Sequence, residues 1–526
     1  MSSLKMKIFS SLLLVALVLS ACQSAATPTA APAATAAPAT TVPIPAATTT
    51  PTMAPPVDIT YNVVGGFPKD LDAVSAAASD MLKQKGINAN FKIISHDWGT
   101  WNDQMKLMYA SNAPCDIVFD PYWGGVIGYN ALVSDGVLLP LDDLLPKYAP
   151  KTLALFTPTF WNGGRINGKI YGVPADGAMK MDLGVILRKD LVQKYNFDVT
   201  TVKPGDWSTL EPLWKSAKAD GIIPFGDFGI NSPAYGGYDI VDSSALLVVK
   251  YDDPNRQVLF YPATDQFKQA VTLMNQWYKA GYTYTDPVNN DDNIANLQAG
   301  KVLAQWLGAA MKPGVADVEW KPRIAGNKYD GIAVSMTTTP FIPSTAFTQN
   351  VNSICKSSLH PEVAMQVLEL MNSDPDFYNL LSLGIEGKHW VWANQASKVY
   401  AAGPNQQDYT PGWGWEVGNT LLGYYPDQAA ADAKIWDETQ QENNTLPVSV
   451  IMGFAFNQDP VKTQYANVVA AITAADVDLG AASTGGRSAD VNADLANLLA
   501  KAKAAGLDDL IAEAQKQVDA WAATQK

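Results

Sequence analysis

The sequence predicts an α/β protein that folds into two lobes, and three observations lead to this prediction. Strand-like and helix-like segments alternate between residues 58 and 120, which is the rhythm of a mostly parallel sheet with helical crossovers. A second apolar strand begins at Leu183, after a polar segment that contains glycine. The chain has 526 residues, which is enough for two or more domains, each with its own core.

The first lobe opens with five predicted elements. Alternating or continuous apolar residues predict strands at 58–64, 90–95 and 116–120. Apolar residues at helical spacing predict helices at 69–85 and 101–110. The first of these helices is followed by a glycine, which commonly ends helices. Together these segments predict the order strand, helix, strand, helix, strand.

The segment 167–176 has the pattern of a chain leaving the first lobe. It starts with an Asn-Gly turn, continues through Gly-Val-Pro, and precedes an apolar run at 183–191 that would enter the second lobe. Further elements are predicted beyond this crossover. They are helices at 266–279 and 363–371, a helix, glycine stop and strand over 294–306, an extended piece at 334–344, and two helices within 490–521 that break at Gly506.

The N-terminus predicts export and lipid attachment. Lys5 and Lys7 precede an apolar run at 8–19 that is too short to span a bilayer. The run ends in Leu-Ser-Ala followed by Cys22, which matches the lipobox of bacterial lipoproteins. We therefore expect a signal peptide at 1–21, a lipidated Cys22 and an Ala/Thr/Pro-rich linker over 22–56 that tethers the folded part to the membrane. The alternative is an ordinary signal peptide with an incidental cysteine.

The sequence lacks the residues that several classes of function require. A net charge of −14 disfavours nucleic acid, which needs a basic surface. The three histidines are far apart in the sequence and show no metal-ligand spacing, and phosphate-binding glycine motifs are absent. We therefore expect no metal, no cofactor and no catalytic group. Cys115 and Cys355 are the other cysteines, and the sequence leaves open whether they form a disulfide or stay as buried thiols.

The chain is rich in tryptophan, with 15 residues beside 21 tyrosines. Several lie next to polar residues in apparent loops, including Trp98, Trp123 and Trp413. An aromatic face can lie on the apolar C–H face of a sugar ring, while carboxylates and amides bind the sugar hydroxyls. Ordinary core packing explains any single one of these residues equally well, but the set favours a sugar-lined site.

Several motifs carry a resemblance to a known family. The segment 167–176 resembles the "G-x-x-Y-G-V-P" crossover of bacterial extracellular solute-binding proteins of the family 1, sugar-binding type. Segments 136–144 and 298–301 match further landmarks of that family. Residues 378–390 resemble the "N-L-L-x-x-G-I-E-G-K-H-Y" segment of LipO/LplA-like lipoproteins, which carry a characteristic C-terminal region of unassigned function. Trp390 departs from the usual tyrosine.

The resemblance implies a two-lobe, periplasmic-binding-protein-like α/β fold of type II, with a ligand cleft between lobes joined by hinge strands. The N-lobe would combine 57–170 with about 345–395, and the C-lobe 171–335 with about 396–526. The hinge crossings would fall near 171–176 and 334–344, with a third after about Trp392.

The resemblance also implies a function. The protein would be the lipid-anchored, extracytoplasmic and monomeric binding subunit of an ABC-type importer, delivering a carbohydrate, in particular an oligosaccharide, to the transmembrane permease subunits without catalysis. If the ligand binds the closed state of the protein more tightly than the open state, closure alone would be sufficient to signal the bound ligand to the permease. The expected ligand-binding residues are four stacking platforms and four hydroxyl partners: Trp98, Trp123, Trp413 and Tyr171, and Asp120, Asp176, Glu386 and Asn419.

Two other functions remain open at this point. A secreted glycoside hydrolase would place two carboxylates across the cleft. A protein that binds peptides or other solutes would use the same fold, with charged groups for the ligand termini in place of tryptophans.

Overall fold

The structure is a computed structural model. It describes residues 55–526, except 112, 176, 227–228, 285–292, 309–319, 322–324, 327, 480–485 and 526. The predicted signal peptide and Cys22 lie outside the described residues, as does the predicted linker up to residue 54. Within the described part, no helix has the length and apolar character needed to cross a membrane.

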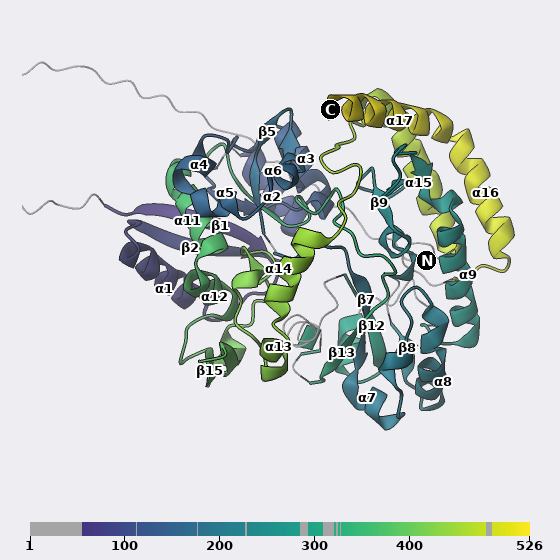
Figure 1. The fold of residues 1–526 in the computed structure, drawn as a ribbon, viewed down its shortest axis with the longest axis horizontal. Coiled ribbons are helices and arrows are strands. Elements are labelled where there is room, and N and C mark those ends of the chain that lie inside the picture. Colours follow the sequence, from purple (N-terminus) through teal and green to yellow (C-terminus); the bar gives the residue numbers. More distant parts are fainter. Residues whose placement is uncertain are drawn as a thin grey trace, which may run out of the picture. The chain divides into compact units, whose positions relative to one another are not determined.

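A five-stranded sheet with the order β2-β1-β3-β14-β6 organises the first lobe (Figure 1). β1 (Val57–Val64) runs parallel to β2 (Ala89–His96) and to β3 (Ile117–Phe119), which confirms the first three predicted strands. β14 (Val351–Ile354) is antiparallel to β3 and to β6 (Gly172–Pro174). The sheet is therefore less parallel than predicted, because β14 is contributed by the chain on its return from the second lobe.

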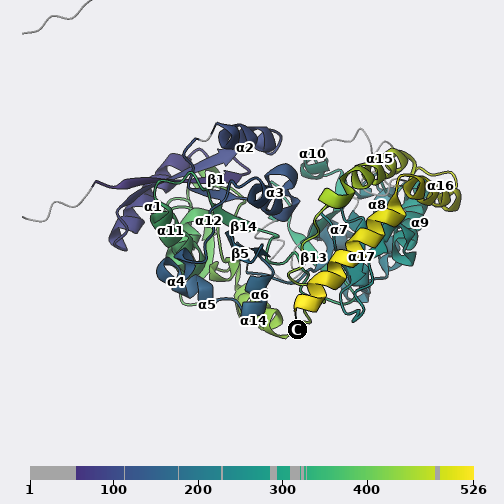
Figure 2. The same cartoon turned by 90° about the horizontal axis from the view of Figure 1, so that it is seen from above.

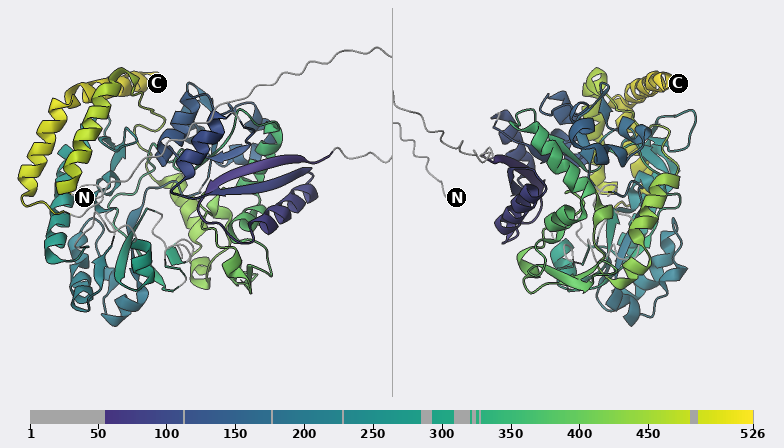
Figure 3. Two further views of the ribbon diagram at one scale, coloured as in Figure 1. Left: turned by 180° about the vertical axis from the view of Figure 1, so that it is seen from behind. Right: turned by 60° about the vertical axis from the view of Figure 1, so that its left-hand side comes forward.

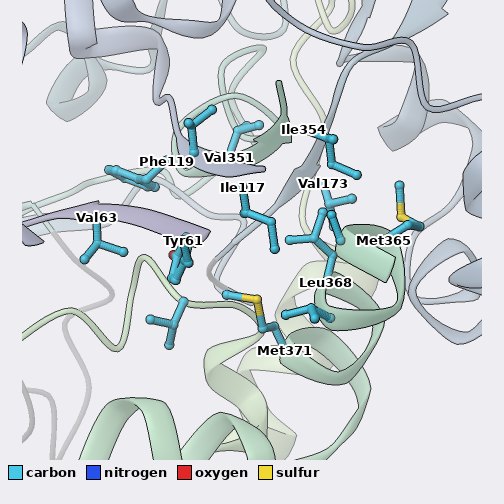
Figure 4. Close-up of a cluster of buried hydrophobic side chains, with 14 of the residues drawn as sticks. Tyr61, Val63, Ile117, Phe119, Val173, Val351, Ile354, Met365, Leu368 and Met371 are labelled. Carbon is cyan, nitrogen blue, oxygen red and sulfur yellow. The ribbon is translucent and has the colours of Figure 1, made fainter. Parts of the chain in front are cut away.

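Four helices supply much of the first lobe's helical packing. α1 (Leu71–Gln84) and α2 (Trp101–Ala110) connect the parallel strands where the sequence predicts them. α11 (Pro361–Ser373) and α12 (Pro375–Leu383) follow β14. Figure 3 shows β1 and β2 side by side with α1 next to them. Figure 4 shows how side chains of α11 meet those of the sheet in the core: Tyr61, Val63, Ile117, Phe119, Val173, Val351 and Ile354 with Met365, Leu368 and Met371.

The second lobe begins with a four-stranded sheet of order β13-β7-β12-β8. β7 (Leu183–Arg188) is buried along all six residues, which explains its continuous apolar run. It is antiparallel to both β12 (Val302–Gly308) and β13 (Gly331–Ser335), while β12 runs parallel to β8 (Ile223–Phe225). The predicted helix at 266–279 is α9 (Asp265–Ala280), whose buried face joins the core of this sheet.

A three-stranded sheet of β11 (Leu259–Phe260), β10 (Leu247–Lys250) and β9 (Tyr238–Ile240) forms the other part of the second lobe. Its apolar residues share one core with three C-terminal helices, two of which confirm the predicted pair broken at Gly506. Figure 2 shows the three helices next to one another. They are α15 (Lys462–Leu479), α16 (Val491–Ala504) and α17 (Leu507–Thr524).

Shorter elements complete the described chain. Asn167 and Gly168 have φ values of 51° and 78° and form the predicted turn between β4 (Arg165–Ile166) and β5 (Lys169–Ile170). The remaining short α-helices and the second hairpin are α3 (Tyr129–Ser134), α4 (Leu144–Tyr148), α5 (Pro150–Ala154), α6 (Pro158–Asn162), α7 (Lys189–Lys194), α8 (Glu211–Ala219), α10 (Asn293–Gln298), α13 (Gln428–Asp432), α14 (Ile435–Thr445), β15 (Trp390–Asn394) and β16 (Val399–Ala402).

The prediction that 396–526 belongs to the second lobe is wrong for the first part of that range. Tyr409, Trp413 and Val417 lie in the core of the five-stranded sheet. The hydroxyl of Tyr61 in β1 donates to the backbone carbonyl of Glu416, at 2.9 Å. This aromatic-rich segment therefore stays in the first lobe because its buried side chains and backbone pair with β1 and α12.

Three segments run between the lobes, and two backbone bridges join them. Met181 pairs with Phe341, and Ile342 pairs with Val448. The crossings therefore lie between β6 and β7, between β13 and β14, and after α14. The third crossing therefore does not follow Trp392, as predicted, but comes about 55 residues later, after α14.

A disulfide joins Cys115 to Cys355, which settles the alternative that the sequence leaves open. Both cysteines are buried, and they link the start of β3 to the end of β14. Disulfides persist in oxidising compartments, so this bond agrees with a protein that works outside the cytoplasm.

Candidate functional site

Three tryptophans gather at one edge of the five-stranded sheet. Trp98 follows β2, Trp123 lies in a 3-10 helix (Tyr122–Ile127) that follows β3, and Trp415 comes from the loop before Asn419. The ring centroids are 6.1 Å apart for Trp98 and Trp123, 6.3 Å for Trp98 and Trp415, and 6.1 Å for Trp123 and Trp415. The ring of Trp98 is nearly parallel to that of Trp415, with an interplanar angle of 15°. We call these three residues the tryptophan cluster.

The tryptophan cluster has exposed rings that pack on buried aromatic side chains. Trp98 is 49% exposed and Trp123 is 39% exposed, whereas Trp101 and Phe119 are buried. Phe119 packs edge-on against Trp415 with centroids 5.3 Å apart. Large aromatic side chains gathered at the surface of a soluble protein mark an interaction site more often than a structural feature.

The topology of the sheet explains the position of the cluster. β1 lies between β2 and β3, so the order of the strands reverses between β1 and β3. Open α/β sheets bind ligands outside the carboxyl ends of strands at such a point. Val64 ends β1, and its backbone N–H donates to Glu416 Oε2 at 3.1 Å, which holds the Trp415 loop at this edge. The cluster therefore lies where this architecture places ligands.

Hydrogen bonds fix two of the three rings. The indole N–H of Trp123 donates to the backbone carbonyl of Gln349 at 2.9 Å, and that of Trp415 donates to the carbonyl of Gly412 at 2.9 Å. The turn that carries Trp98 is closed by the Asp97 side chain, which accepts from the N–H of Gly99 at 2.9 Å. Rings held in this way lose little freedom when a ligand stacks on them.

Asp120 lies beneath the cluster, not at its surface. Its side chain is fully buried, and Oδ2 accepts a hydrogen bond from the Ser353 hydroxyl at 2.9 Å. Oδ1 has no hydrogen-bond partner among the described residues. Burial raises the pKa of Asp120 well above its usual value, and the Ser353 bond opposes this only partly. The predicted role as a hydroxyl partner does not fit a carboxyl group without solvent access.

The raised pKa of Asp120 predicts a specific pH dependence of stability. In the unfolded chain Asp120 loses its proton near pH 4, whereas the folded protein keeps it to higher pH. Folding therefore loses stability as pH rises from about 4 to the folded-state pKa. We expect Asp120→Asn, which cannot ionise, to gain in melting temperature relative to the unmodified protein over this range. A difference between the two proteins that stays constant from pH 4.5 to 8 would contradict this.

Trp413, which the sequence predicts to be a stacking platform, lies in the core of the first lobe and not at the site. It is fully buried in the first core, packs edge-on against Tyr409, and its indole N–H donates to the carbonyl of Leu381 at 3.0 Å. Within the Gly-Trp-Gly-Trp run, the loop turns Trp413 inward and Trp415 toward the cluster. The sequence-based prediction therefore named the member of this pair that lies in the core.

Three other predicted residues lie apart from the cluster. Tyr171 is half-buried, and its backbone N–H donates to the Tyr129 hydroxyl at 3.0 Å. Asn419 is buried, and its side chain accepts from the N–H of Leu421. Glu386 is exposed in the turn before β15. Among the described residues, no hydrogen bond or ring contact joins these three to the tryptophans. Asp176 lies outside the described residues.

Over the described parts of residues 55–526, no group of three or more histidine, cysteine, aspartate or glutamate side chains is arranged to hold a metal ion. His96 contacts the side-chain oxygens of Asn62 and Gln104, and His389 contacts Asp70. The chemistry available at the cluster is therefore that of aromatic surfaces and backbone groups.

Comparison with known proteins decides the family. Residues 76–381 match the model of a family described as bacterial extracellular solute-binding protein. The chain belongs to this family. Residues 450–523 match a domain of unknown function (DUF3502), which confirms that the C-terminal region predicted from the sequence is a recognised unit. Membership of the family places the protein outside the cytoplasm and makes it a solute-binding protein.

Individual relatives extend this result. The solute-binding protein is 25% identical over 470 residues to a carbohydrate ABC transporter substrate-binding protein of Streptococcus pneumoniae serotype 4, covering 88% of this chain and 90% of the relative. It resembles the crystal structure of the N-glycan transport solute-binding protein NgtS from S. pneumoniae, with 22% identity, a TM-score of 0.76, and coverage of 89% of this chain and 100% of the other.

Two further solved structures share the fold. NgtS in complex with Man5GlcNAc gives a TM-score of 0.70 at 24% identity, covering 89% and 99% of the two chains. The alginate-binding protein AlgQ2 gives 0.57 at 15%, covering 88% and 98%. These likenesses confirm the predicted two-lobe, type II binding-protein fold.

Proposed function

We propose that this solute-binding protein captures an oligosaccharide outside the cell membrane and delivers it to an ABC-type importer, without catalysis. The observation that carries the proposal is the tryptophan cluster at the carboxyl edge of the sheet, in which the rings of Trp98 and Trp123 are exposed and those of Trp123 and Trp415 are held by hydrogen bonds. The names of its relatives support it, because the curated relative is a carbohydrate ABC transporter substrate-binding protein and NgtS was solved with mannose-containing glycans.

The cluster suits an oligosaccharide better than a single sugar. Three indoles with centroids about 6 Å apart form a surface wider than one ring, and sugar C–H faces pack on such surfaces. The second lobe would close over the bound glycan. Tyr171 and Asn419 lie near the first crossing, where closure would bring them to the sugar, and Asp176 remains a proposed hydroxyl partner outside the described residues. Gly177 packs directly against the Asn419 side chain in this region.

The remaining parts of the proposal concern domains and anchoring. The first lobe would comprise residues 57–174 with about 345–446, because β6 pairs within its sheet and so extends it past the predicted boundary at 170, and the second lobe would comprise 183–335 with about 450–526. The signal peptide at 1–21 would be removed, a lipid on Cys22 would hold the protein at the membrane, and the linker at 22–56 would give the monomeric binding protein reach toward the permease.

A thermal-shift screen of the purified protein tests the function. Any ligand that binds only the folded state stabilises it, by about 2.7 kcal/mol when its concentration is 100-fold above Kd. We expect oligosaccharides to raise the melting temperature, and peptides to leave it unchanged. A shift with peptides alone would indicate a peptide-binding protein. Release of shorter sugars without a lasting shift would indicate a glycoside hydrolase instead.

A further inference from the structure

Asp239 in β9 is a buried carboxylate that holds two of the segments that cross between the lobes. Its Oδ2 accepts from the backbone N–H of Ser344 at 2.8 Å, and its Oδ1 accepts from the N–H of Ile240 at 2.9 Å. The side chains of Ser344 and Ser449 also lie near this carboxylate and lower its pKa against the effect of burial. Ser344 belongs to the second crossing and Ser449 to the third.

Ser344 lies midway along the second crossing. Phe341, three residues earlier, stacks on Tyr251 of the second lobe with ring centroids 4.7 Å apart. Phe347, three residues later, lies in the core of the first lobe, where it packs against Phe160 at 5.7 Å. The chain therefore passes from one lobe to the other over the seven residues 341–347, and Asp239 binds the middle one, Ser344.

Ser449 occupies the same place on the third crossing. Leu446 packs against the core of the first lobe, whereas Ile451 lies in the core of the second. Between them, Ile342 donates its N–H to the carbonyl of Pro447 and accepts from the N–H of Ser449, each at 2.9 Å. The second and third crossings thus form a two-stranded link, and Asp239 binds this link at Ser344 of the second crossing.

The C-terminal domain of unknown function supports the sheet that carries Asp239. Its helices α15, α16 and α17 share one core with β9, β10 and β11. Gln515 of α17 accepts from the N–H of Val258 at 2.8 Å, and the Arg256 side chain donates to the carbonyl of Val450 at 2.9 Å. This domain therefore packs against the sheet that carries Asp239 and supports it next to the third crossing.

The second crossing also reaches the tryptophan cluster. Five residues after Ser344, the carbonyl of Gln349 accepts the indole N–H of Trp123. Tyr122, next to Trp123, donates its backbone N–H to the carbonyl of Thr348 in the same segment at 2.8 Å. One short segment therefore connects the Asp239 carboxylate to a ring of the candidate site.

We propose that Asp239 is a positioning residue for ligand binding, which fixes the pivot of the two lobes so that closure brings the second lobe onto the tryptophan cluster in one arrangement. This inference rests on the proposed function. In this proposal the C-terminal helices support the sheet that carries Asp239. Asp239 then differs from buried carboxylates whose partners all lie within one lobe.

Asp242 supplies a matched control three residues along the chain. It is buried as well, and burial raises the pKa of both carboxyl groups. Its partners lie within the second lobe: the N–H groups of Ser244 and Leu247 and the hydroxyl of Tyr465. Asp239→Asn and Asp242→Asn therefore remove similar groups, but only the first loosens the crossings.

The experiment compares oligosaccharide affinity and lobe closure for the two variants. We expect Asp239→Asn to raise Kd about tenfold and to reduce the decrease in radius of gyration that glycan causes in X-ray scattering. Asp242→Asn is expected to lower the melting temperature without changing Kd. Should Asp239→Asn not fold, Ser449→Ala removes the hydroxyl that lies near Asp239 and is expected to raise Kd about threefold. Equal Kd values for all variants and the unmodified protein would overturn the proposal.

Hydrogen exchange without glycan separates this proposal from the proposed function. The amide of Ser344 is expected to exchange faster in Asp239→Asn than in Asp242→Asn, because its acceptor is weakened only there. If the unmodified protein binds no glycan but the exchange result holds, the proposed function fails, whereas the role of Asp239 in holding the second crossing is retained. Equal exchange of the Ser344 amide in both variants would show that Asp239 does not hold the second crossing, whatever ligand the protein binds.

Discussion

The double substitution Trp98→Ala and Trp123→Ala is expected to lower oligosaccharide affinity at least about 100-fold. Buried aromatic contacts are the residues that dominate binding, and each can contribute about 2 kcal/mol or more. Stability should change little, because both rings are exposed before ligand binds. Calorimetric titration gives the affinity, and thermal unfolding of the same samples shows whether the fold is retained.

Trp392→Ala is the control for this experiment. Trp392 lies in β15 and packs with Trp390 and Tyr424, with ring centroids 4.8 Å and 4.6 Å away. It is a half-buried tryptophan in a separate aromatic group, so its loss should leave the affinity unchanged. An unaltered affinity in the double variant, or an equal loss in Trp392→Ala, would show that the cluster is not the binding site.

Trp413→Ala should instead act on stability. Its indole is fully buried, and removing it leaves a cavity and takes away one of the two donors to the carbonyl of Leu381, which keeps the Tyr409 hydroxyl. Truncation of a buried tryptophan costs about 3–5 kcal/mol in free energy of unfolding. We expect a loss of this size in urea denaturation, while the folded fraction keeps its affinity.

Trp415→Ala, two residues away, is expected to show the opposite pattern, with weaker binding and a smaller loss of stability. The two variants differ in whether the ring lies in the core or at the sheet edge. If both lose stability equally and neither changes affinity, the loop does not take part in binding.

The fold was accessible to sequence reasoning because its elements carry local signals. Apolar alternation marks β1 and β2, glycine ends the helices, and the Asn167–Gly168 turn requires positive φ values that these residues adopt readily. The antiparallel insertion of β14 had no such signal, because pairing between segments more than 200 residues apart depends on tertiary packing. The third crossing was misplaced for the same reason.

The site was predictable only in part. Trp98 and Trp123 each follow a strand and lie beside turn residues, so their place at the carboxyl edge follows from the parallel topology. The choice between Trp413 and Trp415 depends on how one loop lies against β1, which sequence spacing does not encode. Asp120 follows β3 like a ligand-binding residue, but tertiary packing buries its side chain completely.

A crystal structure of the protein with a bound oligosaccharide tests the central claim most directly. The account predicts a sugar ring in van der Waals contact, within about 4–4.5 Å, of Trp98 or Trp123, with Trp415 at its side and the second lobe closed over it. A glycan bound elsewhere on the molecule, with the tryptophan cluster open to solvent, would contradict it.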